Sequence, residues 1–153
     1  MWTKCRSYGF LCPSLAAFNF KQICLCVEKL HRAGIVHRDL KPENMFFRGD
    51  KVILIDFGSS DDLTQPELRK MKIDDDPKRL THVNFVGTSQ YMAPECVRNK
   101  PVGFEADIWS LGCILYQFIA GMCPFRGASD YLIFRRSTEA KVNLDLLPCD
   151  ESR

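Results

Sequence analysis

The chain has 153 residues, of which 46% are hydrophobic and 26% charged, so it is long enough for one domain with a buried core. Its formal net charge is only +2, from 21 basic and 19 acidic residues, which gives no reason to expect nucleic acid or an anionic membrane surface as a partner. No apolar run approaches the roughly 18 residues of a membrane span, so no transmembrane segment is expected.

The first predicted element is an amphipathic helix over about residues 14–33, which follows an irregular lead-in over 1–13. Ser14 can cap the start of this helix, and Gly34 can end it in a left-handed conformation. Apolar residues at three- and four-residue steps predict one buried stripe. The stripe consists of Ala16, Phe20, Ile23, Val27 and Leu30.

Two short apolar runs, 45–47 and 52–55, enclose a turn at 48–51 that contains Gly-Asp, and this pattern predicts a β-hairpin. A shorter apolar run lies at 35–36. Residues 59–84 are rich in Asp, Lys, Ser and Thr and show no sustained period, so a long loop is expected there. A loop of this length in a compact domain is usually functional.

Residues 105–120 predict a second helix that is buried on most sides, because its apolar residues surround the axis rather than form one stripe. Gly121 ends it. A further helical piece is expected over 131–135, and a polar tail over 137–153. The predicted fold class is mainly α with short β-hairpins, and the domain proper is expected over 14–136.

The eight cysteines show no metal-binding spacing. No Cys-x-x-Cys pair occurs, and Cys24-x-Cys26 has no matching cluster of Cys or His, so no zinc site is expected. Most of them are expected to be small apolar side chains in a reduced, cytoplasmic protein.

Four short motifs carry the strongest functional signal. HRDLKPEN at 37–44 lies on the loop between the first helix and the hairpin, and DFG at 56–58 follows the second strand. APE at 93–95 and DIWSLG at 107–112 come later in the chain. In this order the motifs resemble the signature set of protein kinases. The resemblance implies the C-terminal lobe of a protein kinase, truncated at both ends.

Phosphoryl transfer requires in-line positioning and neutralisation of phosphate charge rather than covalent chemistry by the protein. By resemblance, Asp39 orients the attacking hydroxyl and accepts its proton, and Lys41 contacts the transferring phosphate. Asn44 and Asp56 would hold Mg²⁺, which prefers oxygen ligands. The residues that the resemblance assigns to catalysis are Asp39, Lys41 and Thr88, and those that it assigns to ATP are Lys41, Glu43, Asn44, Phe46 and Asp56.

These residue types also have ordinary structural roles. An isolated Asp after Arg in a loop is usually a solvated turn residue, and Asp107 at a helix start can simply interact favourably with the helix dipole. In the kinase resemblance, Asp107 instead caps the backbone of HRDLKPEN at 37–44, which is the catalytic loop of the family. His37 and Phe57 are expected to be core residues under either interpretation.

Details of the motifs indicate the substrate class. Lys41 in the catalytic loop and Thr88 before APE are similar to the Ser/Thr-specific pattern, in which Thr88 bonds to Asp39 and Lys41. Other segments resemble the phosphoinositide-dependent protein kinases of the AGC group, which phosphorylate the activation loops of other kinases. Those segments are 85–91, 107–117 and 131–134. The implied partner is a protein substrate, with other kinases among the candidates.

The sequence also departs from the kinase pattern. It contains no Gly-rich loop, no phosphate-pairing Lys on a strand and no partner Glu on a helix, so the isolated chain is expected to be inactive. Glu95 pairs in the family with an Arg on a late helix, and here it is expected to lack that partner. The arginines that follow Phe134 are Arg135, Arg136 and Arg153.

A further departure concerns activation. Asn84 stands where the family usually carries a phosphorylated Ser or Thr, whose charge Arg38 would receive, and Asn84 cannot be phosphorylated. Thr81 is a weaker substitute, and the acidic residues at 74–76 could supply negative charge instead.

Three functions therefore compete. The first is a fragment of a working Ser/Thr kinase that uses ATP and Mg²⁺, and the second is a catalytically inactive lobe that acts as a binding module through exposed apolar surface. The third is a small-molecule phosphotransferase of the aminoglycoside kinase type, which the peptide-binding motifs disfavour. The sequence leaves the oligomeric state open.

Overall fold

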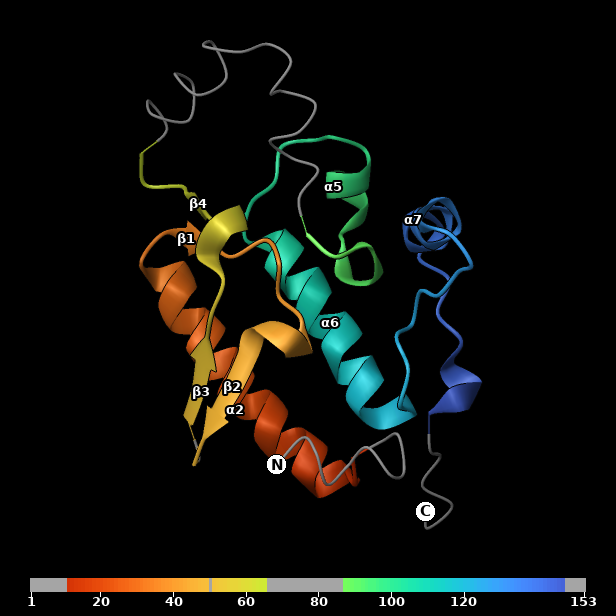
Figure 1. Ribbon diagram of the computed structural model, residues 1–153, viewed down its shortest axis with the longest axis horizontal. Coiled ribbons are helices and arrows are strands. Elements are labelled where there is room, and N and C mark those ends of the chain that lie inside the picture. Colours follow the sequence, from red (N-terminus) through yellow and green to blue (C-terminus); the bar gives the residue numbers. More distant parts are fainter. Residues whose placement is uncertain (1–10, 50, 66–86, 148–153) are drawn as a thin grey trace.

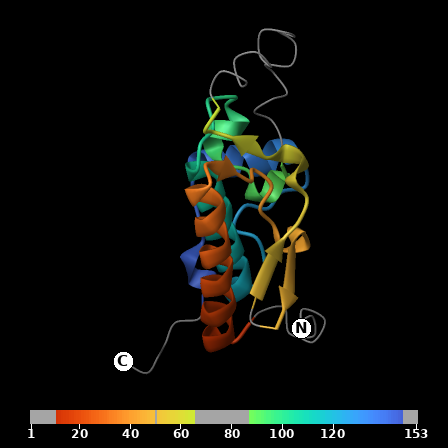
Figure 2. The ribbon, with the colours of Figure 1, turned by 90° about the vertical axis from the view of Figure 1, so that its left-hand side faces the viewer.

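The structure is a computed structural model that describes residues 11–49, 51–65 and 87–147. Two long helices, α2 and α6, lie side by side at its centre, and the β2–β3 hairpin packs on α2 (Figures 1 and 2). The predicted fold class, mainly α with short hairpins, is confirmed. The helices and strands are α2 (Pro13–Arg32), β1 (Ile35–Val36), β2 (Met45–Arg48), β3 (Lys51–Leu54), β4 (Asp61–Asp62), α5 (Pro94–Val97), α6 (Glu105–Ala120) and α7 (Asp130–Glu139).

Helix α2 begins one residue earlier than predicted and differs at its cap. Pro13 occupies the first helical position, where its missing N–H costs no hydrogen bond. Cys12 is the N-cap residue and makes no side-chain capping bond, so the prediction that Ser14 caps the helix was wrong. Gly34 has a φ of 79° and follows the helix end as predicted.

The predicted hairpin forms with Met45 opposite Leu54 and Phe46 opposite Ile53. Met45 and Leu54 are buried in the core with α2, whereas Phe46 and Ile53 face outward. Because side chains alternate across a strand, the same alternation leaves one apolar face of the hairpin uncovered.

A second small sheet pairs β1 with β4, so that Val36 lies opposite Asp61. The expectation of unstructured loop from residue 59 was therefore wrong at 61–62. A two-residue strand has no sequence period, and here its conformation is set by pairing with β1. The remainder of that expected loop, at 66–84, lies outside the described residues.

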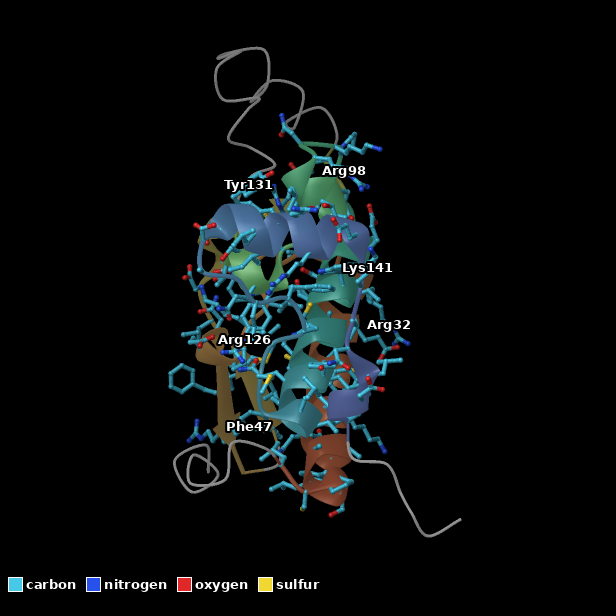
Figure 3. The ribbon with its side chains drawn as sticks, turned by 90° about the vertical axis from the view of Figure 1, so that its right-hand side faces the viewer. Arg32, Phe47, Arg98, Arg126, Tyr131 and Lys141 are labelled. Carbon is cyan, nitrogen blue, oxygen red and sulfur yellow. The ribbon has the colours of Figure 1, made fainter. Side chains whose placement is uncertain are left out.

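Helix α6 matches its predicted bounds and ends at Gly121, which has a φ of 73°. Helix α7 runs beyond the predicted 131–135 to Glu139. Ser137 in its last turn is buried, and its hydroxyl donates to the carbonyl of Phe134. Helix α7 packs against α5, and Tyr131 near its start is exposed (Figure 3).

The largest core cluster joins α2, the hairpin and α6, with Ile23, Leu40 and Ile114 among its most buried side chains. Leu40 belongs to the HRDLKPEN loop, so this loop is anchored in the core by its own apolar residue. Among the described residues, no helix combines the length and the apolar character needed to cross a membrane.

Candidate active site

The HRDLKPEN loop runs from β1 to β2 and is held by Asp107 in the first turn of α6. The buried carboxylate of Asp107 accepts hydrogen bonds from the backbone N–H groups of His37 and Arg38, both at 2.9 Å. Arg38 has a left-handed φ of 68°, which turns the chain sharply before Asp39. The expected capping of this loop by Asp107 is thus observed.

Asp39 lies at the centre of a cluster of donors. Its Oδ1 accepts hydrogen bonds from the backbone N (2.9 Å) and the hydroxyl (3.0 Å) of Thr88. Its Oδ2 accepts hydrogen bonds from Lys41 Nζ (2.7 Å) and Asn44 Nδ2 (3.1 Å). Lys41 Nζ also donates to the Thr88 hydroxyl at 2.8 Å, so both predicted contacts of Thr88 are present. Donors on three sides fix the direction of the carboxylate.

Thr88 reaches Asp39 because the chain passes close to the catalytic loop at Gly87. Gly87 has a φ of 114°, and a Cβ atom at this position would lie 2.8 Å from the carbonyl oxygen of Arg38. Only glycine adopts this conformation and allows this approach without strain. Two segments separated by 49 residues are therefore joined at Asp39.

Asn44 and Asp56 form the oxygen-rich part of the site. The buried Asn44 donates its amide N–H₂ to the Asp39 carbonyl at 2.9 Å as well as to the Asp39 carboxylate, which commits the nitrogen and orients the amide oxygen. The backbone N of Ile55 donates to the Asn44 carbonyl at 3.0 Å, so the hairpin returns the chain beside Asn44 as expected.

Asp56 has a left-handed φ of 62°, and its exposed carboxylate accepts one hydrogen bond among the described residues, from Gly58 N at 3.4 Å. An amide oxygen and a lightly committed carboxylate on adjacent segments suit a hard divalent cation such as Mg²⁺. Asn44 and Asp56 therefore fit the metal that the sequence resemblance implies.

The structure does not join all the predicted residues into one hydrogen-bonded cluster. Asp39, Lys41, Asn44 and Thr88 contact one another through the bonds described above. Within the described part of the chain, the side chains of Asp56, Glu43 and Phe46 make no direct bond to that group, and Glu43 and Phe46 are exposed.

His37 is buried as predicted, and its Nε2 lies 3.1 Å from the Ile55 carbonyl oxygen. The prediction that Phe57 is a core residue was wrong. Its ring contacts the imidazole of His37, with ring centroids 5.0 Å apart, and much of it is exposed. The 3₁₀ turn Phe57–Ser59 directs this ring to the surface.

His31 is a supporting residue that the sequence did not indicate. Its Nε2 lies 2.8 Å from Asp107 Oδ2, and its ring packs on Phe104 with a centroid separation of 4.6 Å. No local pattern marks this histidine, because its partner lies 76 residues away in the chain.

The segment after Thr88 is anchored to α6. The hydroxyl of Tyr91 donates to Gln117 Oε1 at 2.7 Å, and Ser110 Oγ donates to the Tyr91 carbonyl at 2.9 Å. Burial is the main cause that raises the pKa of Tyr91 well above its usual 10.0. Tyr91 is therefore a neutral hydrogen-bonding residue across the physiological pH range.

Glu95, in the APE motif, makes no ion pair with any residue that the structure describes. The expectations for Asn84, Thr81 and residues 74–76 lie outside the described residues.

Asp107 of α6 holds the loop that carries Asp39, Thr88 bonds to Asp39, and the hairpin leads to Asp56. This arrangement is that of the C-terminal lobe of a protein kinase. Residues 2–151 match the family described as Protein kinase domain, and the chain belongs to this family.

The chain is 39% identical over 132 residues to 3-phosphoinositide-dependent protein kinase 1 of Homo sapiens, covering 86% of this chain and 22% of that protein. It is also 39% identical to Serine/threonine-protein kinase PDK1 of Cryptococcus neoformans, over 90% of this chain and 11% of that protein. The identity to Serine/threonine-protein kinase PKH1 of Saccharomyces cerevisiae is 39%, over 86% of this chain and 17% of the relative. The predicted resemblance to the phosphoinositide-dependent subfamily is confirmed, and the chain spans less than a quarter of the length of these three relatives.

Proposed function

We propose that this chain supplies the catalytic loop and the metal ligands of a Ser/Thr protein kinase, which transfers the γ-phosphate of ATP to a Ser or Thr hydroxyl of a protein. The observation that carries the proposal is the carboxylate of Asp39, held by Thr88, Lys41 and Asn44 at 2.7–3.1 Å. A carboxylate fixed in this way can orient a hydroxyl and accept its proton without reorganising during the reaction.

Lys41 has two tasks in this mechanism. In the present structure its ammonium group is bonded to Asp39 and Thr88. When a phosphate group is present, the same ammonium neutralises part of the charge on the transferring phosphoryl group, while Thr88 keeps Asp39 in position.

Asn44 and Asp56 would hold Mg²⁺, which when bound neutralises charge on the phosphates. Glu43 and Phe46 are proposed to contact the nucleotide, since both are exposed at the start of the hairpin and Phe46 offers an apolar ring. Because the resemblance to the phosphoinositide-dependent kinases implies protein substrates that include other kinases, such kinases are the first substrates to test. The six described cysteines are free thiols, which supports a reducing compartment such as the cytoplasm.

Binding of ATP and Mg²⁺ tests the metal site. Titration of the ¹⁵N-labelled chain with ATP and Mg²⁺ should shift the amide signals of Asn44 and Asp56, and Asp56→Asn should weaken the binding by about tenfold or more, because a charged ligand is lost. The matched control is Asp62→Asn, which neutralises an exposed carboxylate that bonds to Thr64 and Gln65. Equal effects of the two substitutions would contradict the metal site.

Transfer itself is tested by phosphorylation of a Ser/Thr peptide, with Asp39→Asn as the baseline. The sequence has no Gly-rich loop, so we expect turnover by these 153 residues alone to be close to that baseline, and Mg²⁺–ATP binding then becomes the decisive measurement.

Exposed apolar side chains on and just after the hairpin favour a second candidate function. In this alternative, the chain is a catalytically inactive lobe that binds the surface of another protein. Phe46 and Ile53 of the hairpin are 57% and 44% exposed, and Ile55 and Phe57, which follow it, are 39% and 47% exposed. Exposed apolar surface commonly marks an interaction site. Turnover clearly above that of Asp39→Asn would exclude this alternative.

A further inference from the structure

Arg38 belongs to the catalytic loop, and its guanidinium lies in the interior of the protein. Its Nη1 is 3.8 Å from Asp61 Oδ2, and the two side chains are only 5% and 14% exposed. Because a charge removed from water is costly unless an opposite charge compensates it, the Asp61 carboxylate stabilises the buried Arg38.

The backbone determines where Asp61 lies. Strand β4 lies beside β1 (Figure 1). In this pairing Asp61 is opposite Val36, two residues before Arg38. The preceding residue, Ser60, donates its hydroxyl to the carbonyl of His37 at 3.3 Å. The carboxylate is thus presented to Arg38 by a sheet that is itself bonded to the catalytic loop.

Arg38 transmits this contact to the site. Its backbone N is bonded to Asp107 at 2.9 Å, its carbonyl oxygen is the atom against which Gly87 packs, and the next residue is Asp39. A displacement of the Arg38 side chain would therefore change both the position of Asp39 and the approach of Thr88.

We propose that Asp61 is a positioning residue, which holds Arg38 and through it keeps the Asp39 carboxylate in contact with Thr88. Strand β4 then supplies a negative charge beside Arg38. The inference rests on the proposed function only where it treats Asp39 as catalytic.

Amide hydrogen exchange of the chain without nucleotide or metal tests this proposal. The Thr88 N–H donates to Asp39 Oδ1, so its exchange rate reports directly on that contact. We expect Asp61→Asn, which keeps the shape and removes the charge, to accelerate Thr88 exchange by about tenfold relative to any acceleration at Ile114 in the core.

The control is a substitution at the adjacent Asp62, and the rescue is a second substitution at Asp61 that keeps the charge. Asp62→Asn, on the same strand but exposed, should leave the Thr88 rate within about twofold of the wild type, and Asp61→Glu should restore most of the protection. Equal acceleration at Thr88 and Ile114 would show a loss of global stability alone and would overturn the proposal, as would an unchanged Thr88 rate in Asp61→Asn.

If Asp61→Asn did not fold, Arg38→Lys provides the second variant, because it keeps the charge but shortens the reach to Asp61. Selective acceleration at Thr88 is again the expected result, and its absence would overturn the proposal. Since no ATP is present, either result is independent of phosphoryl transfer. Conversely, if the wild-type chain did not bind Mg²⁺–ATP while its Thr88 amide stayed protected from exchange, the proposed function would be contradicted and the role of Asp61 would not.

Discussion

The Nε2 of His31 lies 2.8 Å from Asp107 Oδ2, which joins the last turn of α2 to the first turn of α6. The same carboxylate accepts the backbone N–H groups of His37 and Arg38. Two central helices and the catalytic loop therefore meet at one fully buried charge.

Replacing this carboxylate should be costly. We expect Asp107→Ala to lower the free energy of unfolding by about 3 kcal/mol, because hydrogen bonds to a charged group are lost and two buried backbone donors are left without partners. Urea denaturation followed by circular dichroism measures the change. Glu105→Gln, in the same helical turn but exposed, should change the free energy by less than about 0.5 kcal/mol. A similar cost for both variants would contradict the assigned role of Asp107.

The close approach at Gly87 predicts opposite effects of two Gly-to-Ala substitutions. Gly87→Ala should destabilise the protein by about 2 kcal/mol or more, because its φ of 114° is strained for alanine and the new Cβ would meet the Arg38 carbonyl. Gly112→Ala lies within α6, where the new Cβ would meet no described atom within 4 Å apart from its chain neighbours and the adjacent helix backbone, and should stabilise by about 0.5–1 kcal/mol. Thermal unfolding of both variants provides the measurement, and stabilisation by Gly87→Ala would refute the strain argument.

Much of this architecture could be predicted because its signals are local. The apolar residues around the axis of α6 predicted that helix, and two short apolar runs around a Gly-Asp turn predicted the hairpin, each close to its observed bounds. The grouping of Asp39, Lys41 and Thr88 came from the kinase resemblance rather than from periodicity. Spacing along the chain does not show that residues 39 and 88 touch.

The features that the sequence did not reveal depend on distant pairing. Strand β4 exists because β1 lies beside it, and neither two-residue run has a period of its own. The contacts from His31 to Asp107 and from Arg38 to Asp61 cross several elements, and no local pattern marks His31 or Asp61 as a partner. The wrong prediction for Phe57 has a similar origin, because the sequence of a turn does not indicate whether an aromatic side chain in it is buried.

The contacts of Lys41 predict its chemical reactivity. Its ammonium group is bonded to Asp39 and Thr88, so acylation by an N-hydroxysuccinimide ester should be at least about fivefold slower at Lys41 than at the exposed Lys51. Asp39→Asn should accelerate acylation of Lys41 and leave Lys51 unchanged. Peptide mapping by mass spectrometry measures both rates in one sample. Equal rates at the two lysines in the wild type would contradict the observed cluster.

The thiol of Cys113 predicts how stability depends on pH. Burial in α6 raises its pKa from the usual 9.0 to about 12, and nearby Cys123 adds to the rise. Between these two values the unfolded chain has lost the proton that the folded chain keeps, so the free energy of unfolding should fall as pH rises above 9, by up to about 1.4 kcal/mol per pH unit for this thiol. Below pH 9 this contribution is constant. Urea denaturation at a series of pH values should show a shallower fall for Cys113→Ala, whereas Cys12→Ala, at an exposed position, should retain the wild-type slope. Identical slopes for wild type and Cys113→Ala would show that other groups cause the loss of stability at high pH.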